Sequence, residues 1–450
     1  MFFVVKGHGY SIMFETVKNA FKVKEIRNGI LFTLAMLVVV RFGSQLPVPG
    51  VNRTYFADWF SQQTGDAFSL VDAFTGGSFL NMSVFALNIT PYITSSIIIQ
   101  LLTIAIPKLE EMQEEEGEEG RRKLTAITRF VTVALALVQA SAMAIGFGRQ
   151  GLLEEYNAVN VITCIATLTA GSTAVMWIGE RITDRGVGNG ISIVLTINII
   201  SRIPQDMSSL WDQFVSGKSV ANASVAIIII AAIIVGMTVL TILLNDAERR
   251  IPVQNASKMA GRRALGSSLS SIPLKVNTAG VMPIIFASSI MEFPVIISTL
   301  VGYKGTGWWS EALRYLSSSY WCNPNYPKYT LGLVVYVLLL IFFAYFYTSI
   351  TFNPILVADN LKKSGSFIPG IRPGKPTQDY LQRILNYIIF IGAVGLTIVG
   401  VIPFLFRGLF NASVSFGGTS LIIIVSVILE TIKQIESMMV VRNYKAFLTE

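Results

Sequence analysis

The sequence predicts an all-α polytopic membrane protein with ten transmembrane helices. Three observations predict this class: the 450-residue chain is 52% hydrophobic, only 14% of its residues are charged, and its apolar residues gather in long runs. Soluble domains carry about 25% charged residues, so this chain has too little polar side chain to cover one large soluble globule. The same composition excludes an intrinsically disordered protein.

Nine apolar runs are long enough to cross a bilayer, which takes about 20 residues. They cover residues 29–46, 84–106, 124–147, 158–178, 225–244, 277–301, 331–352, 384–406 and 419–437. A tenth run, residues 191–203, has only 13 residues, which by length is also compatible with a re-entrant or buried segment.

The basic residues decide whether the short run crosses. With ten crossings and a cytoplasmic amino terminus, 25 of the 35 Lys and Arg residues fall in inner segments and 8 in outer segments. If residues 191–203 did not cross, the 14 basic residues of the later loops and tail would face outward, against the positive-inside bias. The sequence therefore predicts ten spans, both termini in the cytoplasm and a fifth span shielded by its neighbours. The net charge of +8 then reflects basic cytoplasmic loops rather than DNA binding.

A short internal repeat predicts two inverted halves. NITPYITSSI in the second span echoes AGVMPIIFASSI in the seventh, and NGIS at the start of the fifth echoes GGTS at the start of the tenth. Because each half has five spans, the second copy is inverted in the membrane, and a functional path is expected between the halves. The expected organisation is a basic cytoplasmic segment (1–28), a first half (29–204), a second half (205–437) and a cytoplasmic tail (438–450).

Two large inner loops, at about residues 246–276 and 353–383, are basic and rich in proline and glycine. The first predicts a protruding hairpin with Arg262 and Arg263 near its tip, and the second a stiffened basic loop. Both are compatible with attraction to anionic lipid headgroups. Docking to an acidic or phosphate-bearing partner, such as ribosomal RNA or a motor protein, is favoured because lipid contact needs no projecting scaffold. The acidic run at residues 110–119 predicts a solvated loop.

The segment DAFSLVDAFTGGSF, residues 66–79, is apolar, too short to span, and bends at Gly76 and Gly77. A surface loop or an interfacial helix explains it simply. The sharper hypothesis is a re-entrant segment that fills a cavity on the outer side, because irregular backbone at membrane depth must be surrounded by protein or a water-filled cavity.

Residue chemistry argues against an enzyme. His8 is the single histidine, so histidine triads and histidine-rich metal sites are excluded, and no Walker A motif is present. Charged residues inside the spans are scarce, and Arg41, Glu292 and Glu430 are expected at an interface or in structural ion pairs. No catalytic residue, metal or cofactor is predicted. The alternative to a channel is an inverted-repeat secondary transporter for a small solute.

Several long motifs resemble the SecY family, the channel subunits of the bacterial Sec protein translocon. They are RFGSQLPVPGV, FALNITPYITSSIIIQLL, WIGERITDRGVGNGIS, ERRIPVQNASK, PLKVNTAGVMPIIFASSI, FNPILVADNLKKSGSFIPGIRPGK and GGTSLIIIVSVILETIKQIES. The likeness runs from about residue 13 to the carboxyl terminus. Asn88 and Thr90 stand where the family usually has Gly and Met, and Asn255 where it usually has Tyr.

The resemblance implies a clamshell of two inverted halves around an hourglass pore. Such a gated channel passes unfolded secretory polypeptides across the cytoplasmic membrane and releases hydrophobic segments laterally into lipid. Matching the motifs places an apolar pore ring at Ile89, Ile93, Ile191, Leu195, Ile285 and Ile423. A narrow apolar neck excludes water and ions because it offers them no hydration partners. Without the resemblance, these residues would be read as ordinary core or lipid-facing aliphatics.

The resemblance also implies a plug at about residues 66–80, which includes Phe68, Leu70, Val71, Phe74, Gly76 and Gly77. A lateral gate would lie between the second, third, seventh and eighth spans, with Gln100 and Asn277 as polar residues near the seam. Arg262, Arg263 and Arg372 correspond to contacts for the ribosome and the SecA motor ATPase. The implied partners are SecE, SecG, SecA, the ribosome, polypeptides with signal sequences and anionic lipids.

Overall fold

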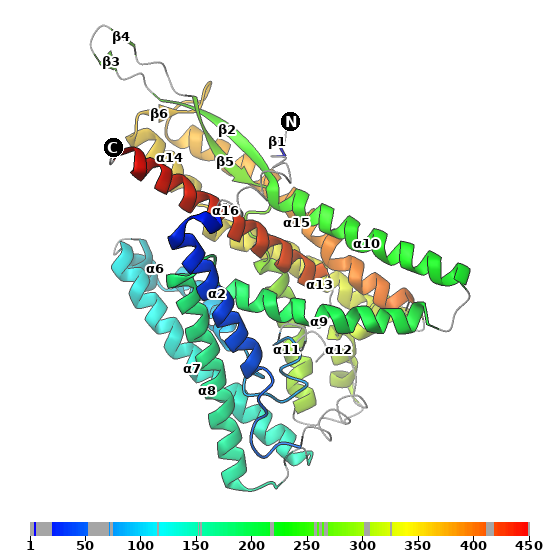
Figure 1. Ribbon diagram of the computed structural model, residues 1–450. Coiled ribbons are helices and arrows are strands. Elements are labelled where there is room, and N and C mark those ends of the chain that lie inside the picture. The colour runs from blue at the N-terminus through cyan, green and yellow to red at the C-terminus, as the bar shows by residue number, and fades with distance from the viewer. Residues whose placement is uncertain are drawn as a thin grey trace.

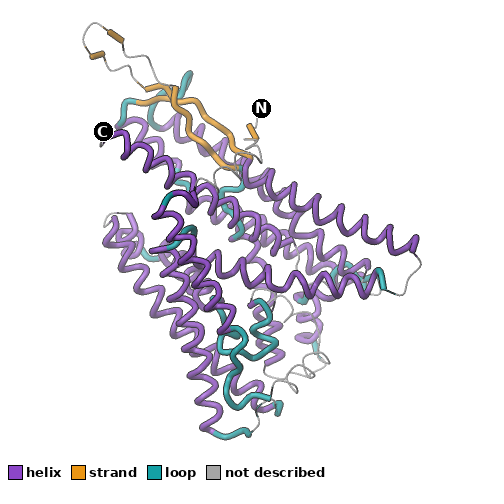
Figure 2. The backbone as a smooth tube through the Cα atoms, in the orientation of Figure 1, coloured by secondary structure: helices purple, strands orange, loops and turns teal. Residues whose placement is uncertain are grey.

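The computed structural model of the protein describes residues 4–5, 20–52, 72, 75–114, 117–151, 153, 155–216, 220–255, 259–260, 263–264, 269–300, 307–324, 326–410 and 418–448. Helices make up most of this chain. Figure 2 shows that the described strands gather at one end of the molecule.

Ten of the described helices correspond to the ten predicted spans, which confirms the all-helical, multi-span class. They are α2 (Lys24–Gly43), α5 (Thr90–Ala105), α7 (Gly117–Arg149), α8 (Ala158–Arg185), α9 (Gly190–Phe214), α10 (Val220–Asp246), α11 (Met282–Leu300), α13 (Leu331–Thr351), α15 (Lys375–Phe410) and α16 (Gly418–Leu448) (Figure 1). By length and composition, six stretches of the described chain can cross a membrane: Lys24–Gly43, Arg122–Arg149, Ala158–Arg185, Ile227–Asp246, Pro327–Lys363 and Lys375–Phe406.

The second span begins later than predicted. Helix α5 starts at Thr90 rather than near residue 84. The preceding residues are occupied by pairing with another segment, since the Val84 backbone N–H donates to the Leu46 carbonyl (2.8 Å) and the Val48 N–H to the Met82 carbonyl (3.0 Å). Asn88 then adopts a positive φ of 48°, which a helix cannot contain, and Pro91 favours the first turn of a new helix.

Helix α9 is longer than the apolar run that predicted it. It has 25 residues and continues past Pro204 into a polar stretch that a hydropathy pattern does not register. Its start is fixed by Asn189, whose side-chain oxygen accepts hydrogen bonds from the backbone N–H groups of Ile191 and Ser192. Gly190 lets α9 approach α8 closely, because a Cβ at this position would overlap the Gly179 carbonyl oxygen. Helices α2, α8 and α16 contact α9, as expected for a shielded span.

Two hydrophobic clusters each belong to one part of the chain. One contains buried residues from Val48 to Leu168, and the other contains buried residues from Met237 to Ile422. A third cluster joins the two parts: Val40, Val175 and Ile199 pack there with Ile423 and Val427 of α16. Burial of apolar side chains at this junction stabilises the contact between the two parts of the chain.

The predicted protruding hairpin is confirmed. Strands β2 (Ala247–Asn255) and β5 (Leu269–Lys275) pair antiparallel, with Ile251 opposite Ile272. Short strands β3 (Met259–Ala260) and β4 (Arg263–Ala264) pair beyond them, at the tip seen in Figure 1. Strand β2 also pairs with β6 (Ser366–Phe367) and with β1 (Val4–Val5). The two basic loops therefore share one sheet, which the sequence did not predict.

Two segments predicted as loops contain helices. The acidic run forms α6 (Pro107–Glu114) and the start of α7, because Glu, Lys and Gln are good helix formers even when solvated. In the second basic loop, α14 (Pro354–Lys363) begins with Asn353 as its cap, and α15 begins at Lys375. A further helix, α12 (Trp308–Leu316), lies in the connection between α11 and α13.

Candidate functional site

The six predicted ring residues come from four helices. Ile89 caps the start of α5, Ile93 lies in its first turn, and Ile191 and Leu195 lie in the first turns of α9. Because side chains four residues apart share one helix face, each pair presents two aliphatic groups in the same direction. Ile285 of α11 and Ile423 of α16 complete the set.

The structure brings all six into the hydrophobic cluster that joins the two parts of the chain. Ile89, Leu195 and Ile423 are buried, with 1%, 6% and 1% of their surface exposed. Ile93, Ile191 and Ile285 are partly buried and pack against the same cluster. These aliphatic groups offer no hydrogen-bond partner to an ion or to water.

Val281 belongs to the same cluster and was missed from the sequence. It lies four residues before Ile285, as Ile89 lies four residues before Ile93, and each pair brackets a proline, Pro91 or Pro283. The internal repeat therefore contained the signal that places Val281 at this junction, whereas the resemblance alone pointed only to Ile285.

The predicted plug is described only in part. Phe68, Leu70, Val71 and Phe74 lie outside the described residues, whereas Gly76 and Gly77 are buried and have φ angles of 65° and 83°. A Cβ on Gly76 would lie 2.8 Å from both Arg41 Nη1 and the Asn198 backbone. The turn thus needs glycine for its conformation and for its close fit against α9.

Polar side chains from two helices hold this turn. Arg41 of α2 donates from Nη1 to the Gly76 carbonyl oxygen (3.3 Å) and to Asn198 Oδ1 on α9 (3.4 Å). Arg41 was expected at an interface or in an ion pair, and its hydrogen-bond partners among the described residues are these two uncharged oxygens close to the turn. The side chain of Glu292, the second intramembrane charge, lies outside the described part of the chain.

An ion pair next to the turn was not predicted. Asp72 has none of its surface exposed and pairs with Arg202 of α9, while its Oδ1 accepts a hydrogen bond from the Leu80 backbone N–H (3.0 Å). Asp72 lies inside an apolar motif and Arg202 at the end of the short apolar run 191–203, so nothing in the local pattern connected the two.

Asn88 links three segments at the start of α5. Its Nδ2 donates to the Thr75 carbonyl oxygen (3.4 Å), and its own carbonyl accepts a hydrogen bond from Ser172 Oγ of α8 (2.9 Å). The polar residue that departs from the family pattern therefore contacts the segment proposed to be the plug. Asparagine also tolerates the left-handed backbone found here better than most residues.

The helices of the predicted gate contact each other across the two parts of the chain. Helix α7 contacts α11, and Ile97 of α5 packs against the cluster formed by the second part. Gln100 is partly buried on α5. Asn277 donates to Asn245 Oδ1 (2.9 Å) at the end of α10, so the described hydrogen bonds do not join Asn277 to Gln100.

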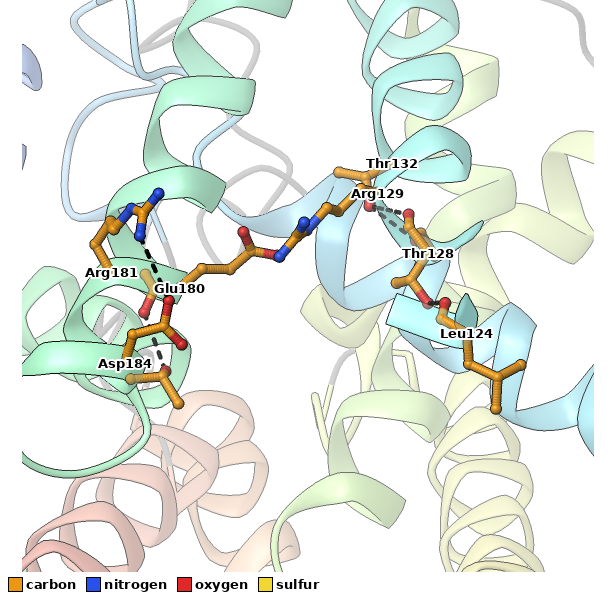
Figure 3. Close-up of polar contacts among 10 residues, drawn as sticks. Leu124, Thr128, Arg129, Thr132, Glu180, Arg181 and Asp184 are labelled. Carbon is orange, nitrogen blue, oxygen red and sulfur yellow. Dashed lines mark hydrogen bonds and ion pairs between the residues drawn. The ribbon is translucent and has the colours of Figure 1, made fainter. Parts of the chain in front are cut away.

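A polar network ties three helices on the first side of this gate. Ser95 Oγ of α5 donates to the Thr128 carbonyl oxygen (2.8 Å) and accepts from Thr132 Oγ1 of α7 (2.8 Å). Figure 3 shows Arg129 of α7 reaching toward Glu180 of α8, where Nε and Oε1 are 2.7 Å apart. Helices α5, α7 and α8 are thus fastened to one another.

Two of the predicted docking residues, Arg263 and Arg372, lie in the described part of the chain. Arg372 is exposed in a turn between Gly370 and Gly374, and its carbonyl oxygen accepts a hydrogen bond from Thr377 Oγ1 (2.8 Å). Arg263 belongs to β4, while Arg262 lies outside the described residues. Across the described chain, no group of three or more His, Cys, Asp or Glu residues is placed to hold a metal ion.

Comparison with known proteins gives consistent matches. The SecY family model matches residues 83–432. The protein translocase subunits SecY of Streptomyces galbus and Corynebacterium glutamicum are 42% and 40% identical to this chain. The alignments cover 97% and 96% of this chain and 100% and 99% of those relatives.

Solved structures share the fold at low sequence identity. A protein-conducting channel matches with a TM-score of 0.60 and 15% identity, covering 94% of this chain and 96% of that one. Sec61 in a canine ribosome–channel complex from the endoplasmic reticulum matches with a TM-score of 0.59 and 14% identity, with the same coverage.

Proposed function

The chain belongs to the SecY family and is a protein-conducting channel, and we propose that Ile89, Ile93, Ile191, Leu195, Ile285 and Ile423 form its pore ring. The observation that carries this proposal is the single cluster in which α5, α9, α11 and α16 bring these six side chains together. Members of the family transport polypeptides without acting as enzymes, so the ring needs no reactive group.

The ring works through what aliphatic side chains lack. Water and ions that enter a narrow apolar neck lose hydration and gain no compensating partner, so the neck stays dry and closed to ions. The hydrophobic contacts that close it have no preferred direction, so the same side chains can pack around an extended polypeptide of any sequence. The same ring thus excludes ions when the channel is at rest and packs around the polypeptide during transport.

Two movable parts complete the proposed gate. Residues 66–80 act as the plug on the outer side of the ring, and the contacts of Gly76 with α2 and α9 support this role.

Helices α5 and α7 on one side and α11 and α13 on the other form the lateral gate. Asn277 Oδ1, which is buried without a hydrogen-bond partner among the described residues, is available to a polar group such as Gln100 at this seam. An apolar signal sequence would leave through the seam because each buried methylene gains about 0.8 kcal/mol in lipid.

The proposed topology places both termini and the sheet in the cytoplasm of a bacterium, with inverted halves at residues 29–204 and 205–437. Figure 1 supports it, because β1, the carboxyl end of α16 and the β2–β5 hairpin lie at the same end of the molecule. The positive-inside bias assigns this basic end to the cytoplasm, where anionic lipid headgroups also attract it.

The basic loops are proposed as docking sites for the motor that drives transport. Arg372, Arg262 and Arg263 would contact acidic or phosphate-bearing surfaces of SecA and the ribosome. The likeness to Sec61 in a ribosome complex supports the ribosome as a partner. SecE would clamp the two halves and SecG would bind at the periphery.

Reconstitution tests this function. Proteoliposomes that contain the chain with SecE, supplied with SecA and ATP, are expected to protect a preprotein with a signal sequence from added protease. The same preprotein without its signal sequence, and vesicles without ATP, are the controls. Absence of protection together with saturable uptake of a small solute would instead support the secondary transporter.

A further inference from the structure

Among the described residues, the buried carboxylates lie where the proposed plug meets α9. Arg41, Asp72, Arg202 and Asp206 come from α2, the plug segment and α9, and Asp72 and Asp206 are both buried. Burying an ionised carboxylate is costly unless a charged partner and hydrogen bonds compensate for the lost water. Asp72 is 0% exposed inside an apolar segment, so its carboxylate is expected to do something that an apolar side chain cannot do.

Asp72 receives that compensation from two directions. One carboxylate oxygen accepts a hydrogen bond from the backbone N–H of Leu80 (3.0 Å), which closes the plug segment on itself. The other oxygen pairs with Arg202, whose side chain is 15% exposed. The Asp72 carboxylate thus stabilises the turn through its hydrogen bond to Leu80 and binds the turn to α9 through its ion pair with Arg202.

Neighbouring hydrogen bonds also hold this turn, but their acceptors are uncharged oxygens. Ser201 Oγ donates to the Gly76 carbonyl oxygen (3.5 Å), which also accepts from Arg41. Thr75 Oγ1 donates to the Asp72 carbonyl oxygen (3.2 Å) and accepts from the Phe79 N–H (3.3 Å). Asp72 with Arg202 is the ion pair that the structure shows between the described part of the plug segment and a spanning helix.

We infer that the ion pair between Asp72 and Arg202 holds the plug in its closed, seated position, and we call this ion pair the latch. Arg202 positions the plug by binding the Asp72 carboxylate. The inference rests on the plug proposed above and names the contact that must break before the plug can leave. Removing the Arg202 charge leaves the fully buried Asp72 carboxylate without its charged partner, which weakens the seated state more than losing both charges does. Paired removal is therefore the distinguishing experiment.

Ion leak through reconstituted channels in planar bilayers tests the latch. Asp72→Asn keeps an oxygen for the Leu80 N–H while removing the charge, and Arg202→Gln shortens and neutralises the other partner. Each single change is expected to raise the resting leak roughly tenfold. The double variant is expected to leak no more than the worse single variant, because the two residues act as one unit.

The matched control is Glu311→Gln. Glu311 pairs with Lys328 (2.7 Å), and both side chains are about half exposed, so removing this charge is expected to leave the leak unchanged. A double variant whose leak equals the product of the two single effects would show independent roles and overturn the latch, as would single variants with wild-type leak.

A chain without residues 66–80 separates this inference from the plug proposal. If that deletion raises the leak and the single variants do not, the latch is wrong and the plug stands. If the deletion leaves the leak at the wild-type level, the segment does not plug the pore, and the latch fails with it.

Discussion

Replacing Ile93 and Ile191 together with serine is expected to raise the resting ion conductance of the channel roughly tenfold. Both residues belong to the junction cluster and are only partly buried, on α5 and α9 respectively. The serine hydroxyls would give water and ions hydrogen-bond partners in the neck and would also widen it. Conductance is measured on purified channels in planar bilayers, in the full chain and in a chain without residues 66–80, so that the plug does not hide a leaking ring.

The control for this prediction is a pair of identical substitutions at the outer surface of the bundle. Ile162 of α8 and Ile228 of α10 are 65% and 66% exposed, so Ile162→Ser and Ile228→Ser change polarity away from the junction cluster. Their conductance should equal that of the wild type. If the Ile93 and Ile191 variant also conducts like the wild type in both backgrounds, these two residues do not line the neck.

Arg372→Glu is expected to reduce SecA-driven secretion at least about tenfold while leaving membrane insertion of the channel intact. The side chain is exposed, and the turn that presents it is fixed by Gly370, Gly374 and the hydrogen bond from Thr377. Reversing its charge replaces attraction to an acidic or phosphate-bearing partner with repulsion. ATP-dependent translocation into proteoliposomes measures the effect, and Arg372→Lys should retain part of the activity because it retains the charge.

Lys22→Glu controls for a general change of charge. Lys22 is exposed and precedes α2, outside the loop that carries Arg372, so this variant makes the same reversal elsewhere. It should translocate nearly as well as the wild type. Equal losses in both variants would assign the effect to overall charge rather than to docking at Arg372, and full activity of Arg372→Glu would remove the docking role.

The helices were predictable to the extent that hydropathy determines them. Long apolar runs became α2, α8, α10, α13 and α15, because lipid-facing and core positions are both apolar. The pattern failed where polar residues continue a helix, as in α9 after Pro204, and where backbone pairing precedes one, as before Thr90. Strand β6 was not predictable, since a two-residue strand exists only through its pairing with β2.

The candidate site was predictable through resemblance rather than through periodicity. Nothing in the isolated sequence distinguishes Ile423 from the aliphatic residues beside it, and only its packing with α9 and α5 gives it a position at the junction. The Asp72–Arg202 pair was missed for a different reason. The two residues are 130 positions apart in the sequence, and the periodicity around an Asp between apolar residues does not indicate which basic residue pairs with it.

Crosslinking of a stalled secretory chain tests the pore ring most directly. A photo-reactive residue is placed in turn at Ile89, Ile93, Ile191, Leu195, Ile285 and Ile423, and at Ile228 and Leu338, which are 66% and 62% exposed. The ring predicts that the stalled polypeptide crosslinks at all six positions and at neither exposed control. Crosslinks from the six positions to lipid alone, with the polypeptide captured elsewhere, would contradict it.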